Sequence, residues 1–165
     1  KEQFMNLDAT AVRNLELIKN MRDGSKRGTL LDVLDFTSTS MGARKLRNWI
    51  ECPLLDLSQI RSRQEAVGEL LTNVQMRGNL QDKLKAIFDL ERIVSRIEVG
   101  SANARDLVSL RSSLAVLPEI KSLLRYCNSK LLQQLCEDVH CIRSCLLLCW
   151  QQLLMSRPFP YVKGA

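Results

Sequence analysis

The sequence is poor in the residues that mark turn-rich β folds. It has only seven Gly, four Pro and 5% aromatic residues in a chain of 165. No segment alternates apolar and polar side chains for long enough to predict a strand. The composition, 45% apolar and 25% charged, is ordinary for a globular domain. These shortages predict an all-α fold without a significant sheet.

Histidine is almost absent, and the cysteines lack metal-ligand spacing. His140 is the sole histidine, and no Cys-x-x-Cys pair occurs among the six cysteines, which stand at 52, 127, 136, 141, 145 and 149. A zinc site of the usual Cys/His type therefore lacks support. No recognisable motif supplies a Ser or Cys nucleophile that His140 could activate, so we expect His140 at the surface or at a helix end. The sequence predicts no catalytic residue, no cofactor-binding residue and no metal ligand.

Targeting and phosphate-binding signals are missing as well. No apolar run approaches the roughly 18 residues that span a bilayer, and the polar Lys1-Glu2-Gln3 opening does not resemble a signal peptide. We therefore expect a cytoplasmic protein with reduced thiols and no membrane partner. The glycine-containing segment 23–28 lacks the Gly-Lys-Ser/Thr ending of a phosphate loop, so it predicts a surface turn.

Charge is unevenly distributed. The net charge is +6, but the only basic residues after residue 140 are Arg143, Arg157 and Lys163, and no acid follows that point. Residues 1–140 therefore carry +3, with basic and acidic side chains alternating. A nucleic-acid module shows basic residues clustered on one face. The charge pattern predicts solvated helix faces instead.

Apolar residues recur at spacings of three and four along most of the chain. Expected helices cover residues 8–21, 29–34, 40–51, 58–73, 80–97, 103–117 and 119–135. Side chains of the first two, Val12, Leu15, Ile18, Met21, Leu30, Leu31, Val33 and Leu34, are expected to be buried. Asp8 is the first cap, and Thr29 with Asp32 resembles a capping box. Residues 80–97 form the cleanest amphipathic pattern, ended by Gly100, and Pro118 bends or ends the helix that Asn103 starts.

Charged residues around position 90 are not expected to form a site. Asp89 and Glu91 lie two apart, which places them on different sides of a helix, so they should not converge as a carboxylate pair. Arg92 and Arg96 stand one turn apart. We expect them to pair with acids of a neighbouring helix rather than to capture phosphate.

The segment from residue 40 to residue 67 predicts a helix, a break at Pro53 and a second helix. Ser40 is the expected cap of the first helix and Asp56 or Ser58 that of the second. The expected apolar faces are Met41, Leu46, Trp49 and Ile50, then Ile60, Val67, Leu70 and Leu71.

This segment resembles the core, or lever, domain of the bacterial MutS mismatch-repair proteins. The resemblance lies in Met41-Gly42-Ala43-Arg44-Lys45-Leu46-Arg47-Asn48-Trp49-Ile50, Pro53-Leu54-Leu55-Asp56 and Ile60-Arg61-Ser62-Arg63-Gln64-Glu65-Ala66-Val67. Further blocks follow in the family's order: Leu7-Asp8-Ala9-Thr10, Thr29-Leu30-Leu31-Asp32, Asp89-Leu90-Glu91-Arg92-Ile93 and Ala104-Arg105-Asp106-Leu107. The similarity covers roughly residues 4–140.

The resemblance implies an irregular helical domain with long amphipathic helices. In the family this domain is a scaffold that couples the mismatch-binding, clamp and ATPase domains. The full-length proteins bind mismatched double-stranded DNA, ATP and Mg through other domains, and the resemblance implies a homodimer. This chain lacks the Phe-x-Glu mismatch reader, the clamp tips and the phosphate loop. The resemblance therefore implies a fragment without enzymatic activity or cofactor of its own.

Two alternatives remain open. The chain can be a free-standing helical module that binds a protein partner, or the same domain of a paralogue that does not act in mismatch repair. The reading frames on either side of the gene would discriminate between them.

Residues 141–165 form a second unit that departs from the family. Cys141, Cys145 and Cys149 stand four apart, which invites interpretation as a metal or redox stripe. Residues 150–165 can be encoded by codons that, when read two bases later, specify a sequence resembling the MutS family at this point of the domain. Our hypothesis is a frameshift between about His140 and Trp150, so that the domain proper covers residues 1–140.

Overall fold

The computed structural model describes residues 3–139, and nearly all of their regular structure is helical. The helices are α1 (Ala9–Asn14), α2 (Leu30–Leu34), α3 (Ser40–Glu51), α4 (Leu57–Thr72), α5 (Val74–Lys85), α6 (Leu90–Glu98) and α7 (Ala104–Leu124). Residues 130–139 are also helical. The only β pairing within 3–139 is an isolated antiparallel bridge between Phe4 and Leu54. The predicted all-α fold is confirmed.

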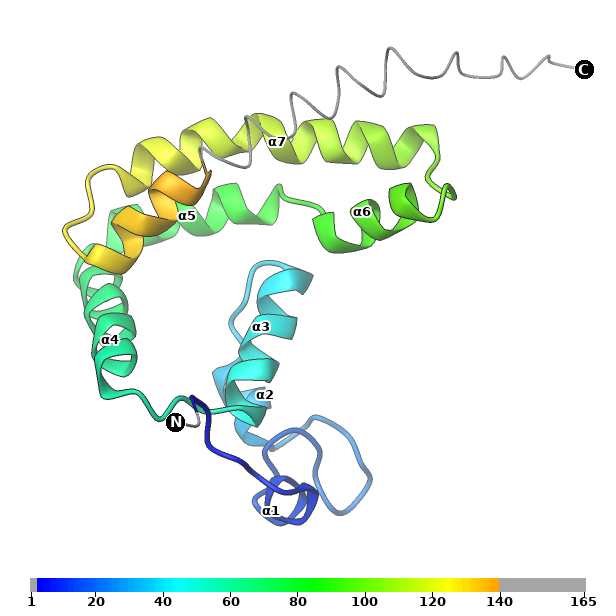
Figure 1. Cartoon of the computed structure of the whole chain (residues 1–165), viewed down its shortest axis with the longest axis vertical. Helices are drawn as coiled ribbons and strands as arrows, with labels where there is room; N and C mark the ends of the chain where they lie inside the picture. The colour runs from blue at the N-terminus through cyan, green and yellow to red at the C-terminus, as the bar shows by residue number, and fades with distance from the viewer. Residues whose placement is uncertain (1–2, 140–165) are drawn as a thin grey trace, which may run out of the picture.

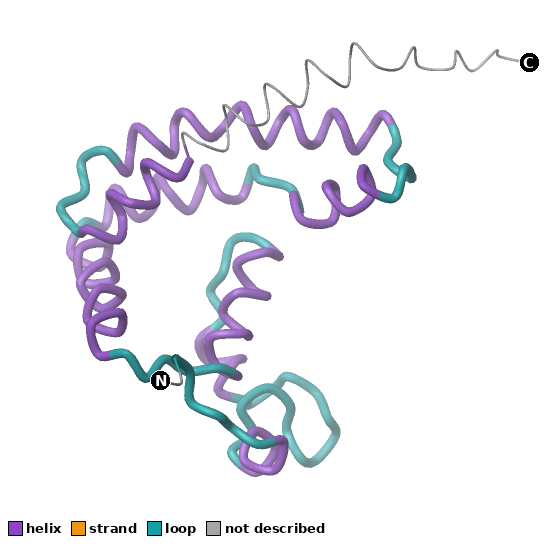
Figure 2. The backbone as a smooth tube through the Cα atoms, in the orientation of Figure 1, coloured by secondary structure: helices purple, strands orange, loops and turns teal. Residues whose placement is uncertain are grey.

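The helices follow an open curve (Figures 1 and 2). Helices α1, α2 and α3 form one end, α4 leads away from them, and α5 and α6 lie along α7 at the other end. The N-terminal end of α3 points towards α6. Within the described range, no helix has both the length and the apolar character needed to cross a membrane.

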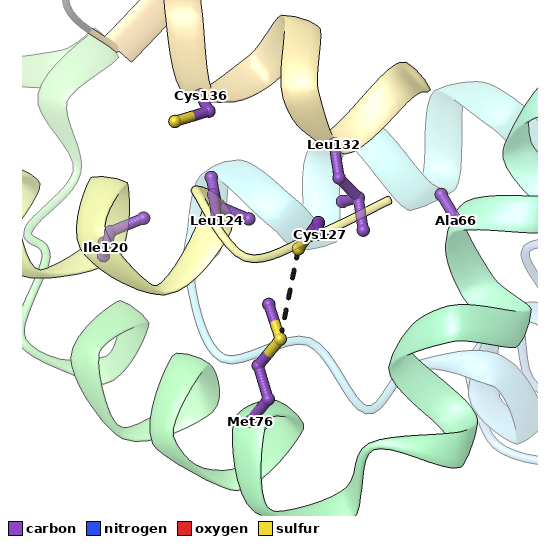
Figure 3. Close-up of a cluster of buried hydrophobic side chains, with 7 residues drawn as sticks. All are labelled: Ala66, Met76, Ile120, Leu124, Cys127, Leu132 and Cys136. Atoms are coloured by element: carbon purple, nitrogen blue, oxygen red, sulfur yellow. Dashed lines mark hydrogen bonds between the residues drawn. The ribbon is translucent and has the colours of Figure 1, made fainter. Parts of the chain in front are cut away.

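The buried side chains form two separate clusters, one at each end of this curve. The first core consists of Leu17, Ile18, Leu31 and Ile50, from the segment after α1, α2 and α3. The second core joins α4, α5, α7 and residues 127–136 (Figure 3), and consists of Ala66, Met76, Ile120, Leu124, Cys127, Leu132 and Cys136. No buried residue belongs to both clusters, so each end of the curve is stabilised by its own core.

Short polar side chains start the helices, as the sequence predicts. Asp8, Thr29, Asp56 and Asn103 accept hydrogen bonds from backbone amides in the first turns of α1, α2, α4 and α7. Such bonds satisfy amides that have no partner within the helix. The cap of α3 is Thr39, which corrects the expected Ser40. Thr29 accepts from the Asp32 amide, but Asp32 accepts from Gly28 rather than from Thr29, so the expected capping box is displaced by one residue.

The expected helix over 8–21 is wrong in its second half. Helix α1 ends at Asn14, and Glu16 adopts a left-handed φ of 47°. The Glu16 carboxylate accepts a hydrogen bond from the Met21 amide at 2.6 Å, which stabilises the turn that replaces the helix. Ile18 is buried as expected, and Leu17 is buried with it, whereas Leu15 and Met21 are exposed.

Several other expected apolar faces are only partly buried. In α2, Leu31 alone is buried, and Leu30, Val33 and Leu34 remain exposed. In α3, Ile50 is buried and Trp49 is partly exposed, with the Arg63 guanidinium 3.9 Å from its ring centroid. In α4, the buried residue is Ala66, and Val67 and Leu71 face outward. Hydrophobic spacing therefore located these helices and some of their buried residues, such as Leu31 and Ile50, but it overestimated how much of each apolar face is buried.

The expected helix over 80–97 is two helices. Helix α5 begins at Val74, before the expected start at residue 80, and the chain breaks at residues 86–89. Asp89 caps the new helix α6. Gly100 adopts a φ of 72° and donates to the Ile97 carbonyl, which confirms the predicted stop.

Helix α7 runs through Pro118 to Leu124, so the proline does not end it and no helix starts at residue 119. Its buried side contains Asp106, Ser113, Leu117, Ile120 and Leu124. Among the leucines at helical spacing along α7, Leu117 is buried, whereas Leu107, Leu110 and Leu114 are half-buried. The expected helix over 119–135 is interrupted, because the next helical residue after α7 is Lys130.

Candidate functional site

Arg44 joins the two ends of the curve through an ion-pair cluster that we call the Arg44 junction: Ser40, Arg44, Asp89 and Glu91. From α3, Arg44 Nη1 and Nη2 donate to the two carboxylate oxygens of Asp89 at 2.8 and 2.7 Å. Its Nε donates to Glu91 Oε2 at 2.9 Å. Ser40 Oγ donates to Asp89 Oδ2 at 3.0 Å. The planar guanidinium thereby fixes the start of α3 against the start of α6.

Within the junction, Arg44 interacts more strongly with Asp89 than with Glu91. The Arg44 guanidinium, with a smaller contribution from the Ser40 hydroxyl, holds the pKa of Asp89 well below its usual range. Asp89, and then Glu91, raise the pKa of Arg44 above its usual range. The Asp89 side chain is 18% exposed and that of Glu91 is 66% exposed. Asp89 is therefore the principal partner, since solvent screens Glu91 more strongly.

This geometry corrects the expectation that Asp89 and Glu91 cannot converge. Asp89 is the cap of α6 rather than a residue within it, so its side chain is not bound by helical spacing. Arg44 approaches from a different helix and reaches both carboxylates. Helical spacing would separate the two acids only if both lay within α6, and Asp89 precedes that helix.

The two arginines of α6 make different ion pairs. Arg96 Nη2 donates to Asp106 Oδ1 of α7 at 2.6 Å, which confirms the predicted pairing with a neighbouring helix. Asp106 also closes the capping box of α7 by accepting from the Asn103 amide. Arg92 instead lies 3.4 Å from Asp89, three residues earlier in the chain, so the expectation of a partner on another helix is wrong for Arg92.

Ser113 stabilises the non-helical segment between α5 and α6, which ends at Asp89. Its hydroxyl donates to the Ser109 carbonyl at 2.9 Å and accepts from the Phe88 amide at 3.0 Å. Ser113 is fully buried in the middle of α7. It therefore ties the segment between α5 and α6 to α7, and sequence patterns gave no sign of this role.

A second long-range contact, here called the Glu69 clip, joins α4 to the start of helical residues 130–139. The Glu69 carboxylate accepts from the backbone amides of Asn128 and Ser129 at 2.6 and 2.8 Å. A carboxylate at a helix N-terminus satisfies free amides and interacts favourably with the helix dipole. The Ser129 hydroxyl is buried and has no hydrogen-bond partner within residues 3–139. Glu69 is thus the group that determines how this helix begins.

No group of three or more potential metal ligands occurs among the described residues. Cys127 and Cys136 lie in the second core, where burial raises the pKa of the Cys127 thiol, and Cys52 is exposed. His140, Cys141, Cys145, Cys149 and the proposed frameshift lie outside the described residues. That the chain has no catalytic, cofactor-binding or metal-ligating residue stays a prediction, as does the boundary at residue 140.

The polar contacts between segments can position the helices, and helices held by such contacts can shift when the contacts break. The Arg44 junction and the Glu69 clip both use charged groups at helix ends, and both connect segments far apart in the chain. The Arg44 junction consists of partly exposed ion pairs, which are worth little individually, so it can break and re-form without unfolding the cores.

Comparison with known proteins identifies the family. The family model described as MutS domain III matches residues 10–155. The chain is 52% identical over 132 residues to the DNA mismatch repair protein MutS of Symbiobacterium thermophilum, covering 80% of this chain and 15% of that protein. For the protein of the same name from Pelotomaculum thermopropionicum, the identity is 53% over 122 residues, or 74% of this chain and 14% of that protein.

A longer alignment, like the family match, extends into residues 141–165. The chain is 40% identical over 161 residues to the MutS protein of Clostridium novyi, which covers 98% of this chain and 18% of the relative. The chain thus spans less than a fifth of the length of these curated relatives. The family match covers most of the residues that form the helical architecture. The chain belongs to the MutS domain III family.

Proposed function

We propose that this chain is a fragment of a DNA mismatch-recognition ATPase, and that its own role is to couple the mismatch-binding, clamp and ATPase domains. The observation that carries the proposal is the Arg44 junction, which links α3 in one half of the fold to α6 in the other. A coupling element needs stiff helices with contacts at their ends that can switch. It needs no catalytic side chain.

The packing supports this role. Each core is built from buried side chains that pack together, whereas the contacts between α3 and α6 are mainly ionic and partly exposed. A force or displacement applied to either half would therefore act first on the Arg44 junction. The Glu69 clip adds a second such contact, between α4 and residues 130–139.

Other domains of a longer protein would supply the chemistry. We infer that mismatched double-stranded DNA, ATP and Mg are bound outside this chain, that the full-length protein is a cytoplasmic homodimer, and that this fragment is not itself an enzyme. The similarity to proteins named DNA mismatch repair protein MutS supports this inference.

A chimera tests the coupling role directly. The matching 132-residue segment of the Symbiobacterium thermophilum protein is replaced by that of this chain. We expect the chimera to bind a mismatched duplex and to release it when ATP is added. Arg44→Ala should leave mismatch binding and ATP hydrolysis in place but weaken ATP-triggered release, because the link between α3 and α6 is lost. Release is followed by fluorescence anisotropy of a labelled duplex.

Arg47→Ala is the matched control, since Arg47 lies in the same helix and, among residues 3–139, its ion pair is with Glu51 one turn away. It should release DNA as the unsubstituted chimera does. A chimera that folds and binds the mismatch yet shows the same release with Arg44→Ala would contradict the role of the junction. An unsubstituted chimera that folds but never couples ATP to release would contradict the proposed function itself.

A free-standing interaction module is the second candidate. A cleft of about 410 Å³ between residues 36–42, α4 and α5 is lined by exposed apolar side chains, among them Phe36, Val67 and Leu71. Such a surface suits a protein partner. Sequencing the locus discriminates: flanking frames that encode mismatch-binding and ATPase domains favour the first proposal, and their absence favours the module. The domain order would likewise reveal a paralogue outside mismatch repair.

A further inference from the structure

A groove of about 700 Å³ lies between α1, the turn that follows it and the C-terminal end of α3. Its apolar wall is formed by Leu7, Val12, Ile18 and Met21. Met21 is 59% exposed, and its backbone is fixed by the bond to Glu16. A flexible, polarisable methionine on a fixed backbone is suited to contacts with apolar side chains of varied shape.

Three cations and one acid line this groove, which gives its lining a net charge of +2: Arg13, Lys19, Arg47 and Glu51. Arg47 pairs with Glu51 at 3.2 Å. The nearby Asp8 and Glu16 do not line the groove, and they accept from the Ala11 and Met21 amides, each at 2.6 Å. Arg13 and Lys19 line the groove, and neither forms an ion pair with any acid in residues 3–139. Two cations therefore border an apolar surface without neutralising partners.

We propose that this groove binds an acidic amphipathic helix presented by a separate protein. Apolar side chains of the helix would occupy the wall around Val12 and Met21, and its Asp or Glu side chains would pair with Arg13 and Lys19. Complementary charge at the rim steers the encounter and selects the partner, while burial of the apolar face provides the affinity. The inference does not depend on the coupling role.

The lining favours a peptide over nucleic acid. Proteins that hold single strands combine cations with aromatic side chains on which bases stack. Among residues 3–139, no Phe, Tyr or Trp lines this groove, and most of its lining surface is apolar. Phosphates could pair with Arg13 and Lys19, but the bases would have no aromatic ring to stack on, whereas leucine-like side chains would be removed from water at the apolar wall.

The test is selection from a displayed library of randomised peptides, each long enough for about three helical turns, against the 165-residue chain. We expect enrichment of peptides with apolar residues three and four apart and Asp or Glu between them. Their affinity, measured by fluorescence anisotropy, should fall as salt rises. Failure to enrich binders, or enrichment of basic or uncharged ones, would overturn the proposal.

Substitutions then locate the binding. Arg13→Gln with Lys19→Gln should weaken the selected peptides roughly threefold to thirtyfold, as expected for two exposed ion pairs. Met21→Asp should weaken them further by placing a like charge in the apolar wall. Arg22→Gln with Arg27→Gln, which changes two exposed arginines that do not line the groove, is the matched control. Circular dichroism confirms that each variant is folded.

Other occupants give distinct outcomes. Equal binding by all variants, displacement of the peptides by a duplex that loses affinity with Arg13→Gln and Lys19→Gln, or self-association abolished by Met21→Asp would each reject a partner helix. Where the gene encodes flanking domains, peptides that bind this chain but not the longer protein would assign the groove to a neighbouring domain and reject a separate partner. Binding to both supports the proposal.

Discussion

Ser113 is a small side chain on which the course of the backbone between α5 and α6 depends. Ser113→Ala leaves the Phe88 amide without its acceptor, and we expect a loss of about 1–2 kcal/mol in the free energy of unfolding. Urea denaturation followed by circular dichroism measures the loss. Ser112→Ala, at an exposed neighbouring position, is the control. Equal stability of the two variants would show that the Phe88 bond does not hold the break.

Asp89 makes stability depend on acidity. Since its folded pKa lies below the unfolded value of about 4, the folded state binds fewer protons than the unfolded state between these values. The stabilisation from the ionised carboxylate is therefore present above about pH 4 and is lost as the pH falls further.

Asp89→Asn keeps a residue suited to capping α6 but removes the charge. We expect it to be less stable than the wild type at neutral pH, with a difference that shrinks below about pH 4. Urea titrations across this range measure the difference. Asp82→Asn, which removes an exposed acid paired with Lys85, is the control. A difference that stays constant or grows on acidification would contradict the ion pair with Arg44.

Helix α7 contains a proline, Pro118, which disfavours a continuous helix. Pro118 has no amide hydrogen to complete the backbone bonding in the middle of α7, and it lies on the exposed side. Pro118→Ala should stabilise the protein by about 1–2 kcal/mol, since the helical gain exceeds the entropy that proline removes from the unfolded chain. Thermal unfolding measures the gain, with exposed Arg111→Ala as the control. A lower melting temperature would mean that the proline is required for the shape of α7.

Local chemistry predicted the helices and most of their caps, because a capping side chain and its amide lie within a few residues of each other. The break between α5 and α6 escaped prediction. It depends on Ser113, which lies 25 residues beyond Phe88. The Arg44 junction escaped for the same reason, since Arg44 and Asp89 are 45 residues apart. Such contacts follow from the arrangement of whole helices, and periodicity does not encode that arrangement.

At the scale of the molecule, two cores predict weakly cooperative unfolding. Leu31→Ala removes buried side-chain volume from the first core, and Met76→Ala does so in the second, each at a cost of about 2–5 kcal/mol. Hydrogen exchange by mass spectrometry should show faster exchange mainly in the core that carries the substitution. Loss of protection in both cores with either variant would instead indicate one cooperative unit.

The balance of charges over residues 1–140 predicts at most weak DNA binding that is lost at physiological salt. Anisotropy of a labelled duplex across a salt series measures it. A salt-resistant preference of this chain for a mismatched over a matched duplex would contradict the assignment of DNA recognition to other domains.

The positions of these contacts in the sequence also determine the order in which they can form during translation. All residues of the first core lie between positions 17 and 50, so this core can form while α4 is still being synthesised. Arg44 gains its partners only when residues 89 and 91 leave the ribosome, and Glu69 gains its partners later, with residues 128 and 129. Translation therefore closes the Arg44 junction before the Glu69 clip. A nascent chain arrested between these points would carry the first contact without the second.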